Sequence, residues 1–218
     1  APELLEVAEE TLREWMDSPE LAPYHVYTRD ILRRKPHTLP QAQERLLAEA
    51  GDALSATSKV FGMLNNLDIP SYFGKIKDTQ GEEVPLSHAT YSKLMESANR
   101  AVRKEVFQAY FKEYGQHRNA LAASLEGHVK GSLFNASMKN YTSAIEAALF
   151  SDEVPTSVYN NLIDSVHTSL PDFYKYVAFR KERLDLDFLH IYDMRAPIVA
   201  DVELSYTWQE AEDLVCES

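Results

Sequence analysis

The spacing of apolar residues predicts helices along most of the chain. Near its start, apolar side chains recur at steps of three and four residues, with Glu and Arg between them; the apolar positions are Leu4, Leu5, Ala8, Leu12, Trp15 and Met16. This spacing places the apolar side chains on one face of a single opening helix.

Capping signals predict where the following helices begin and end. Ser18-Pro19 suits an N-cap and the first position of a second helix, which Lys35-Pro36 should end. Residues 38–41, Thr-Leu-Pro-Gln, resemble a capping box. The Ala- and Leu-rich run that follows, to about residue 67, predicts one helix or two helices broken near Gly51.

Residues 71–86 follow a different rhythm. Two short runs with β-forming residues flank Asp78-Thr-Gln-Gly81, which suits a four-residue turn closed by glycine. We therefore predict a β-hairpin here, and it is the one piece of sheet that we expect in a mainly α chain.

The second half of the chain returns to helical spacing. Ser87 is expected to cap a helix, and residues 99–140 predict one very long helix or two in series, with Gly115 as the natural break. Gly127 and Gly131 lie four residues apart on one face, where we expect a neighbouring helix to approach closely.

The last quarter contains two proline-led helix starts. Pro155 is expected to open one helix and Leu170-Pro171 another. Residues 190–206 look irregular, and residues 207–210, Thr-Trp-Gln-Glu, form a capping box for a last helix. We treat residues 1–218 as a single helical segment, with a possible subdivision into 1–70, the hairpin 71–86 and 87–218.

Composition narrows the classes of partner. The formal net charge of -12 leaves no positive field to displace counterions, which argues against a nucleic-acid partner. The one basic run, Arg33, Arg34 and Lys35, is interpreted as a solvated helix end. No stretch approaches the roughly 18 apolar residues that span a bilayer, so no membrane partner is expected. The single cysteine, Cys216, suits a reducing compartment, and we expect a cytoplasmic protein.

No catalytic or metal-binding residue can be assigned from the motifs alone. An HExxH site needs two imidazoles one helical turn apart with a glutamate as general base, and none of the seven histidines has that spacing. Cys216 has no histidine nearby, and no GxSxG, GxGxxG or GxxxxGK[ST] motif is present. The substrate-binding residues stay unknown.

Two weaker metal-like spacings suggest a helical di-metal site as a separate hypothesis. Asp164-x-x-His167 and Asp187-x-x-His190 have the i, i+3 spacing that helical di-metal sites use, although such sites normally carry glutamate. Chance matches in an acidic chain are the simpler explanation, with the two histidines partly exposed on the surface.

Aromatic and basic residues offer two further alternatives. Nine tyrosines have helical spacing and are interpreted as packed side chains, with a peptide-binding wall as the alternative: Tyr24, Tyr27, Tyr110, Tyr114, Tyr141, Tyr159, Tyr174, Tyr176 and Tyr192. Four basic residues are interpreted as surface helix pairs rather than buried ion pairs: Arg100, Arg103, Arg180 and Lys181.

Several phrases in fixed order resemble oligoendopeptidase F and its relatives among the M3-type zinc metallopeptidases. They are Arg34 to Leu39, Asn99 to Lys104 with Phe107 and Tyr110, Tyr141 to Leu149, Val154-Pro155 with Val158-Tyr159, Leu170-Pro171 with Tyr176 and Arg180-Lys181, and Tyr192-Asp193 with Pro197. Three positions depart from the family pattern, namely Pro40, Asn99 and Lys139, where Ser, Asp and Arg are usual.

The resemblance implies a multi-helix shell of the zincin type, similar to neurolysin, around a channel that admits short peptides. It also implies one zinc ion, held by HExxH and a downstream glutamate that this chain does not contain. The chain would then supply channel wall or lid and bind no cofactor itself, with short peptides and the remainder of the peptidase chain as partners. The alternative is a non-catalytic helical scaffold or peptide-binding module. A segment of a larger enzyme should also expose apolar faces on its first and last helices.

Overall fold

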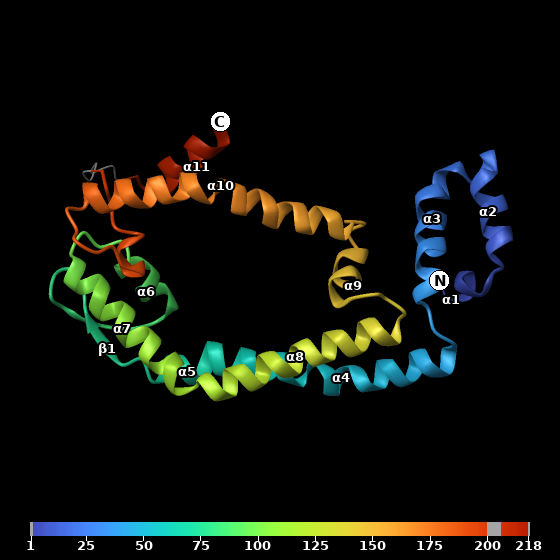
Figure 1. The fold of residues 1–218 in the computed structure, drawn as a ribbon, viewed down its shortest axis with the longest axis horizontal. Coiled ribbons are helices and arrows are strands. Elements are labelled where there is room, and N and C mark those ends of the chain that lie inside the picture. Colours follow the sequence, from blue (N-terminus) through green and yellow to red (C-terminus); the bar gives the residue numbers. More distant parts are fainter. Residues whose placement is uncertain (1, 200–205, 218) are drawn as a thin grey trace. The chain divides into compact units, whose positions relative to one another are not determined.

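The computed structural model describes residues 2–199 and 206–217 and divides the chain into two compact units. Unit 1 contains Ala1–Asp68 and His117–Thr168, and unit 2 contains Ile69–Gln116 and Ser169–Ser218. The described chain is mainly α-helical, as predicted (Figure 1). The proposed subdivision into 1–70, 71–86 and 87–218 stays a prediction.

The described elements of unit 1 are all helical. Its elements are α1 (Pro2–Glu6), α2 (Glu9–Asp17), the 3-10 helix η1 (Pro19–Tyr24), α3 (His25–Arg34), the 3-10 helix η2 (Lys35–His37), α4 (Gln41–Met63), the π-helical turn η3 (Leu64–Asp68), α8 (Arg118–Met138), α9 (Ala144–Phe150) and the first part of α10 (Thr156–Arg183).

Unit 2 contains the two-stranded sheet. Its elements are α5 (Ile69–Ser71), β1 (Lys75–Lys77), β2 (Glu83–Pro85), α6 (His88–Leu94), α7 (Arg100–Gln116), the end of α10, the 3-10 helix η4 (Ile191–Asp193) and α11 (Trp208–Glu217).

The opening helix is two helices, so the prediction of one continuous helix was wrong. Ala8 has an extended backbone, with φ -58° and ψ 144°, between α1 and α2. The interruption frees the carbonyl oxygen of Val7, which accepts a hydrogen bond from Lys35 Nζ. A tertiary partner 28 residues away therefore accompanies the break. Leu12 and Ile31 are buried between α2 and α3.

The second predicted helix begins with a 3-10 helix. Pro19 occupies its first turn after Ser18, as expected, but the Ser18 side chain makes no capping bond, and the α-helix proper starts at His25. It ends at Arg34, before Pro36, as predicted. The capping box at residues 38–41 is not formed, because the Thr38 hydroxyl donates back to the Arg34 carbonyl.

Helices α4 and α8 lie side by side and form the main helix pair of unit 1 (Figure 1). α4 is continuous through Gly51. A Cβ added at Gly127 would lie 2.4 Å from Thr57 Cγ2, and one added at Gly131 would lie 3.6 Å from the Leu54 carbonyl oxygen. The close approach predicted at these two glycines is confirmed, because a side chain at Gly127 would collide with α4.

The predicted hairpin is present. β1 and β2 are antiparallel, with Ile76 opposite Val84. The turn is closed by a hydrogen bond from the Gly81 N–H to the Asp78 carbonyl at 3.2 Å, and Gly81 has φ +87°, which glycine adopts without strain. Ser87 then caps α6, accepting from the Thr90 N–H at 3.1 Å.

In two regions the long helices begin and end at residues other than those predicted. Residues 99–140 form two helices in series, α7 and α8, which end and begin on either side of His117 rather than at Gly115. α10 continues through Pro171, so the second predicted helix start there was wrong. Pro171 removes the donor to the His167 carbonyl, and since His167 is exposed, water can bond that oxygen instead.

The end of the chain has exposed apolar side chains. The capping box at residues 207–210 is confirmed: the Thr207 N–H bonds the Glu210 carboxylate at 2.7 Å. Trp208 is 85% exposed and Val215 75% exposed on α11. Trp15 on α2 is also exposed, whereas Leu4 is half-buried.

Within residues 2–199 and 206–217, no helix has both the length and the apolar character that crossing a bilayer requires.

Candidate functional site

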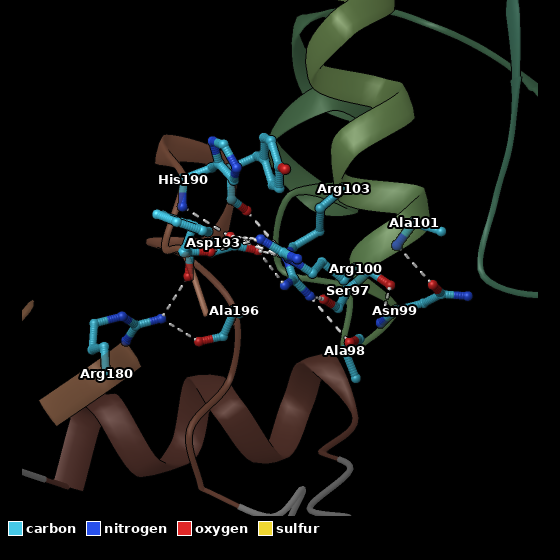
Figure 2. A network of polar contacts seen from close by, with 12 residues as sticks. Ser97, Ala98, Asn99, Arg100, Ala101, Arg103, Arg180, His190, Asp193 and Ala196 are labelled. Atoms are coloured by element: carbon cyan, nitrogen blue, oxygen red, sulfur yellow. Dashed lines mark hydrogen bonds and ion pairs between the residues drawn. The ribbon is translucent and has the colours of Figure 1, made fainter. Parts of the chain in front are cut away.

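A buried polar network in unit 2 surrounds Asp193 (Figure 2). Asp193 ends the short helix η4 and is 0% exposed. Three arginines converge on it or on its backbone: Arg100 and Arg103 come from the first turn of α7, and Arg180 comes from the last turn of α10. We call these four residues the Asp193 cluster.

The start of α7 aims two guanidinium groups at the carboxylate. Asn99 caps the helix, its side-chain oxygen accepting from the Ala101 N–H at 3.0 Å. Arg100 and Arg103 are three residues apart and therefore lie on one side of the helix. Arg103 donates to Asp193 Oδ1 at 2.8 Å, and Arg100 donates to Asp193 Oδ2 at 3.0 Å.

Backbone groups complete the cluster. The His190 N–H donates to Asp193 Oδ2 at 3.0 Å. Arg103 also donates to the Tyr192 carbonyl at 3.0 Å and to the Ser97 carbonyl at 2.7 Å. Both carboxylate oxygens are therefore occupied, and the loop that leads into α7 is tied to η4.

Arg180 holds the other side of η4. Its Nη2 donates to the carbonyl oxygens of Asp193 and Ala196, and its Nη1 donates to the Tyr176 hydroxyl at 3.0 Å. Arg180 is 5% exposed, and its Nε atom has no hydrogen-bond partner. The segment from Phe188 to Ala196 is thus fixed to α7 by two arginines and to α10 by a third.

The interpretation of these basic residues as surface helix pairs is wrong for the arginines. Arg103 is 2% exposed, and Arg100 shares its buried carboxylate partner. The pattern missed this because the carboxylate lies 90 residues away from Arg103. Lys181 is exposed, as expected. The spacing of Arg100 and Arg103 could have indicated the cluster. An exposed helix would normally pair such arginines with acidic residues one turn away, and a pair without them suggests a partner elsewhere in the chain.

The environment of Asp193 keeps it ionised. Burial alone would raise the pKa of the carboxyl group, but hydrogen bonds from Arg100, from the His190 N–H and from Arg103 outweigh this effect and lower the pKa from 3.8 to about 2. At neutral pH the cluster therefore contains one negative and three positive charges.

The lowered pKa predicts a pH dependence of stability. Because the pKa is lower in the folded chain than in the unfolded chain, the contribution is fully present above about pH 4 and is lost as the pH falls toward 2. We expect a loss of roughly 2 kcal/mol over that window. Urea unfolding of the chain and of an Asp193→Asn variant at several pH values tests this, because the difference between the two isolates Asp193. A difference that stays constant from pH 6 to pH 2 would contradict the assignment.

The Asp193 cluster holds chain segments in place and is poorly suited to catalysis. A carboxylate whose oxygens are both bonded to arginines, and whose pKa lies far below neutrality, is a poor general base. The cluster therefore determines where residues 188–196 lie with respect to α7 and the end of α10.

A second cluster in unit 1 involves His37, which follows α3. His37 Nδ1 is 2.9 Å from the Lys139 carbonyl oxygen, and its ring stacks on Tyr141 with centroids 3.8 Å apart. Phe150 meets both rings edge-on, and the Arg33 guanidinium lies 4.0 Å above the Phe150 ring. The family-like phrases at 34–39 and 141–149 are thus brought together inside unit 1, as those at 99–104 and 192–193 are inside unit 2.

The metal-like spacings lie on the surface. Asp164, His167, Asp187 and His190 are all exposed, and His190 stacks on Tyr192 with centroids 4.9 Å apart. In residues 2–199 and 206–217, no three or more His, Cys, Asp or Glu side chains gather as metal ligands would. The residues present do not fit a zinc site.

The tyrosines divide into packed and exposed groups. Tyr192 is buried, Tyr110 stacks on Phe73 and Tyr91, and Tyr141 stacks on His37, so packing is confirmed for these three. Tyr114 is half-buried. Packing is wrong for five others, which are at least 40% exposed: Tyr24, Tyr27, Tyr159, Tyr174 and Tyr176.

Two family models match the chain in succession. The model described as Oligopeptidase F matches residues 3–70, and the model described as Peptidase family M3 matches residues 93–208. The second match alone covers more than half of the chain. Together they include both the His37 cluster and the Asp193 cluster.

Individual relatives agree with the models. The chain is 41% identical to Oligopeptidase PepF of Bacillus subtilis, over 97% of this chain and 32% of that protein. It is 36% identical to Group B oligopeptidase PepB of Streptococcus agalactiae, over 96% of this chain and 35% of that protein. The crystal structure of oligoendopeptidase-F from Enterococcus faecium matches with a TM-score of 0.83 and 38% identity, over 91% of this chain and 39% of that chain. The chain spans about a third of the length of the first two of these relatives.

Proposed function

The chain belongs to peptidase family M3, and from this premise we propose that it is a helical, non-catalytic part of a zinc metallo-endopeptidase that hydrolyses short oligopeptides inside a channel. The observation that carries the proposal is the succession of the two family models along residues 3–70 and 93–208. In this proposal the chain supplies wall or lid, and the enzyme acts in the cytoplasm.

The side chains present favour a structural role for this chain over a catalytic one. Its sequence contains no HExxH motif, and its described acidic and histidine side chains do not gather as a zinc site. Its buried polar groups are instead used to fix segments against helices, as Arg103 and Arg180 do around Asp193. Zinc would supply an activated water for peptide hydrolysis from residues outside this chain.

The test compares two polypeptides. One is the 218-residue chain, and the other is the product of the uninterrupted reading frame that encodes it. We expect the longer product to cleave a quenched fluorescent peptide of about ten residues and to leave a folded protein intact, since only a flexible chain fits a narrow channel. We expect the 218-residue chain to show no cleavage with added zinc.

Three results would overturn the proposal. One is cleavage by the 218-residue chain itself. Another is a longer product that binds peptide without cleaving it, which would favour a peptide-binding scaffold. The third is a reading frame that stops at Ser218 with no partner chain that carries HExxH. Loss of cleavage with a zinc chelator, and its return with zinc, supports the metallopeptidase assignment.

A further inference from the structure

The first half of α10, which belongs to unit 1, carries exposed apolar side chains. Every residue from Thr156 to Ser169 is exposed. Four of them form what we call the α10 stripe, defined as Tyr159, Leu162, Ile163 and Val166; Leu162 is 63% exposed and Val166 is 52% exposed.

The stripe occupies one side of the helix. At about 100° per residue, its four side chains fall within roughly a third of the circumference. Two polar residues of the same turns, Asn161 and Asp164, lie on the opposite side. The stripe itself carries no charge, so the surface that it fits is apolar.

The same side of α10 is an established interface further along the helix. Continuing the spacing of the stripe leads to Val177, which is half-buried, and Arg180, which is buried. There the segment around Asp193 and Ala196 covers the helix through the hydrogen bonds of Arg180. The apolar side is therefore covered at its C-terminal end and open along its first half.

A helix in this condition needs a partner to stay folded. α10 has 28 residues, and most of the stability of a helix in a protein comes from packing of its apolar face rather than from propensity. Pro171 removes one helical hydrogen bond, which weakens the connection between the exposed half and the anchored half. An exposed apolar stripe of this length is typical of an interaction surface.

The lengths of the relatives indicate the partner. This inference rests on the proposed function. The chain matches about a third of PepF and 39% of the oligoendopeptidase-F crystal structure, at a TM-score of 0.83. Most of each relative therefore lies outside the matched part. We infer that the α10 stripe docks against an apolar helix face belonging to the remainder of the peptidase, and that α10 is stable along its first half only when that remainder is present.

Hydrogen exchange measures this directly and does not depend on activity. We expect the amides of residues 158–168 to exchange rapidly in the 218-residue chain and at least about 100-fold more slowly in the longer product. In the longer product, Leu162→Asp should remove most of that protection because it places a charge in the apolar contact. The matched variant Asn161→Asp adds the same side chain on the opposite face and should leave the protection unchanged.

The outcomes separate the inference from the proposed function. Protection that is equal in the two polypeptides, or that Leu162→Asp leaves intact, overturns the docking even if the longer product cleaves peptides. Protection that appears in the 218-residue chain and rises with its concentration also overturns it, because the occupant is then a second copy. Protection lost with Leu162→Asp alone supports the docking even if no peptide is cleaved. Both substitutions are at exposed positions, so the circular dichroism of the 218-residue chain should stay the same.

Discussion

Replacing Asp193 with asparagine is expected to lower the free energy of unfolding by about 3 to 5 kcal/mol. The carboxylate is fully buried, and it is the charge partner of Arg100 and Arg103. Removing its charge leaves the guanidinium of Arg103 buried without a counter-charge, and that penalty exceeds the worth of the lost bonds. Urea unfolding followed by circular dichroism at neutral pH measures the loss.

The control for Asp193→Asn lies directly before residues 188–196. Asp187 is exposed, and Asp187→Asn makes the same chemical change at a position that water reaches. We expect it to change the free energy of unfolding by less than about 0.5 kcal/mol. If the two variants lose the same free energy, the burial of Asp193 has no energetic consequence, and the Asp193 cluster does not fix residues 188–196.

Local features of the fold could be predicted from the sequence because their partners are close in the chain. Ser87 bonds the Thr90 N–H, and Gly81 closes the turn that Asp78 opens, each within four residues. Capping and turn chemistry act over that distance. Hence the hairpin, the start of α6 and the capping box of α11 were predictable.

Features that depend on distant partners could not be predicted in the same way. The interruption at Val7 and Ala8 is accompanied by a hydrogen bond from Lys35, and apolar spacing contains no information about that bond. The Asp193 cluster joins residues up to 93 positions apart. Its arginines therefore resembled ordinary surface residues. Only the order of the family-like phrases indicated that these segments belong together, and that order does not say which side chains meet.

The two clusters have a common physical role. The His37 cluster fixes the end of α3 to α9 and to the end of α8, and the Asp193 cluster fixes η4 to α7 and α10. Each connects segments far apart in the chain through charged or aromatic side chains. The proposed role as wall or lid of a channel would require such fixed connections.

Replacing Gly127 with alanine is expected to destabilise unit 1, although alanine is the better helix former. The new Cβ would lie 2.4 Å from Thr57 Cγ2 and 3.3 Å from Thr57 Cβ. Thr57 is β-branched and has little freedom to rotate within α4, so the two helices must separate. We expect a loss of about 1 to 3 kcal/mol, partly offset by about 1 kcal/mol of helix propensity. Thermal unfolding followed by circular dichroism measures the net change.

The matched variants make this expectation specific to the contact between α4 and α8. Gly131 faces the same helix, but a Cβ there would meet only the Leu54 carbonyl oxygen at an ordinary 3.6 Å, so Gly131→Ala should stabilise the chain. Thr57→Ser removes the colliding methyl group and should rescue Gly127→Ala, while it lowers stability slightly on its own because it leaves a small void. If Gly127→Ala lowers stability, Gly131→Ala raises it and Thr57→Ser restores the loss at Gly127, the close approach of α4 to α8 is supported. Equal stabilisation by both alanines would contradict that approach.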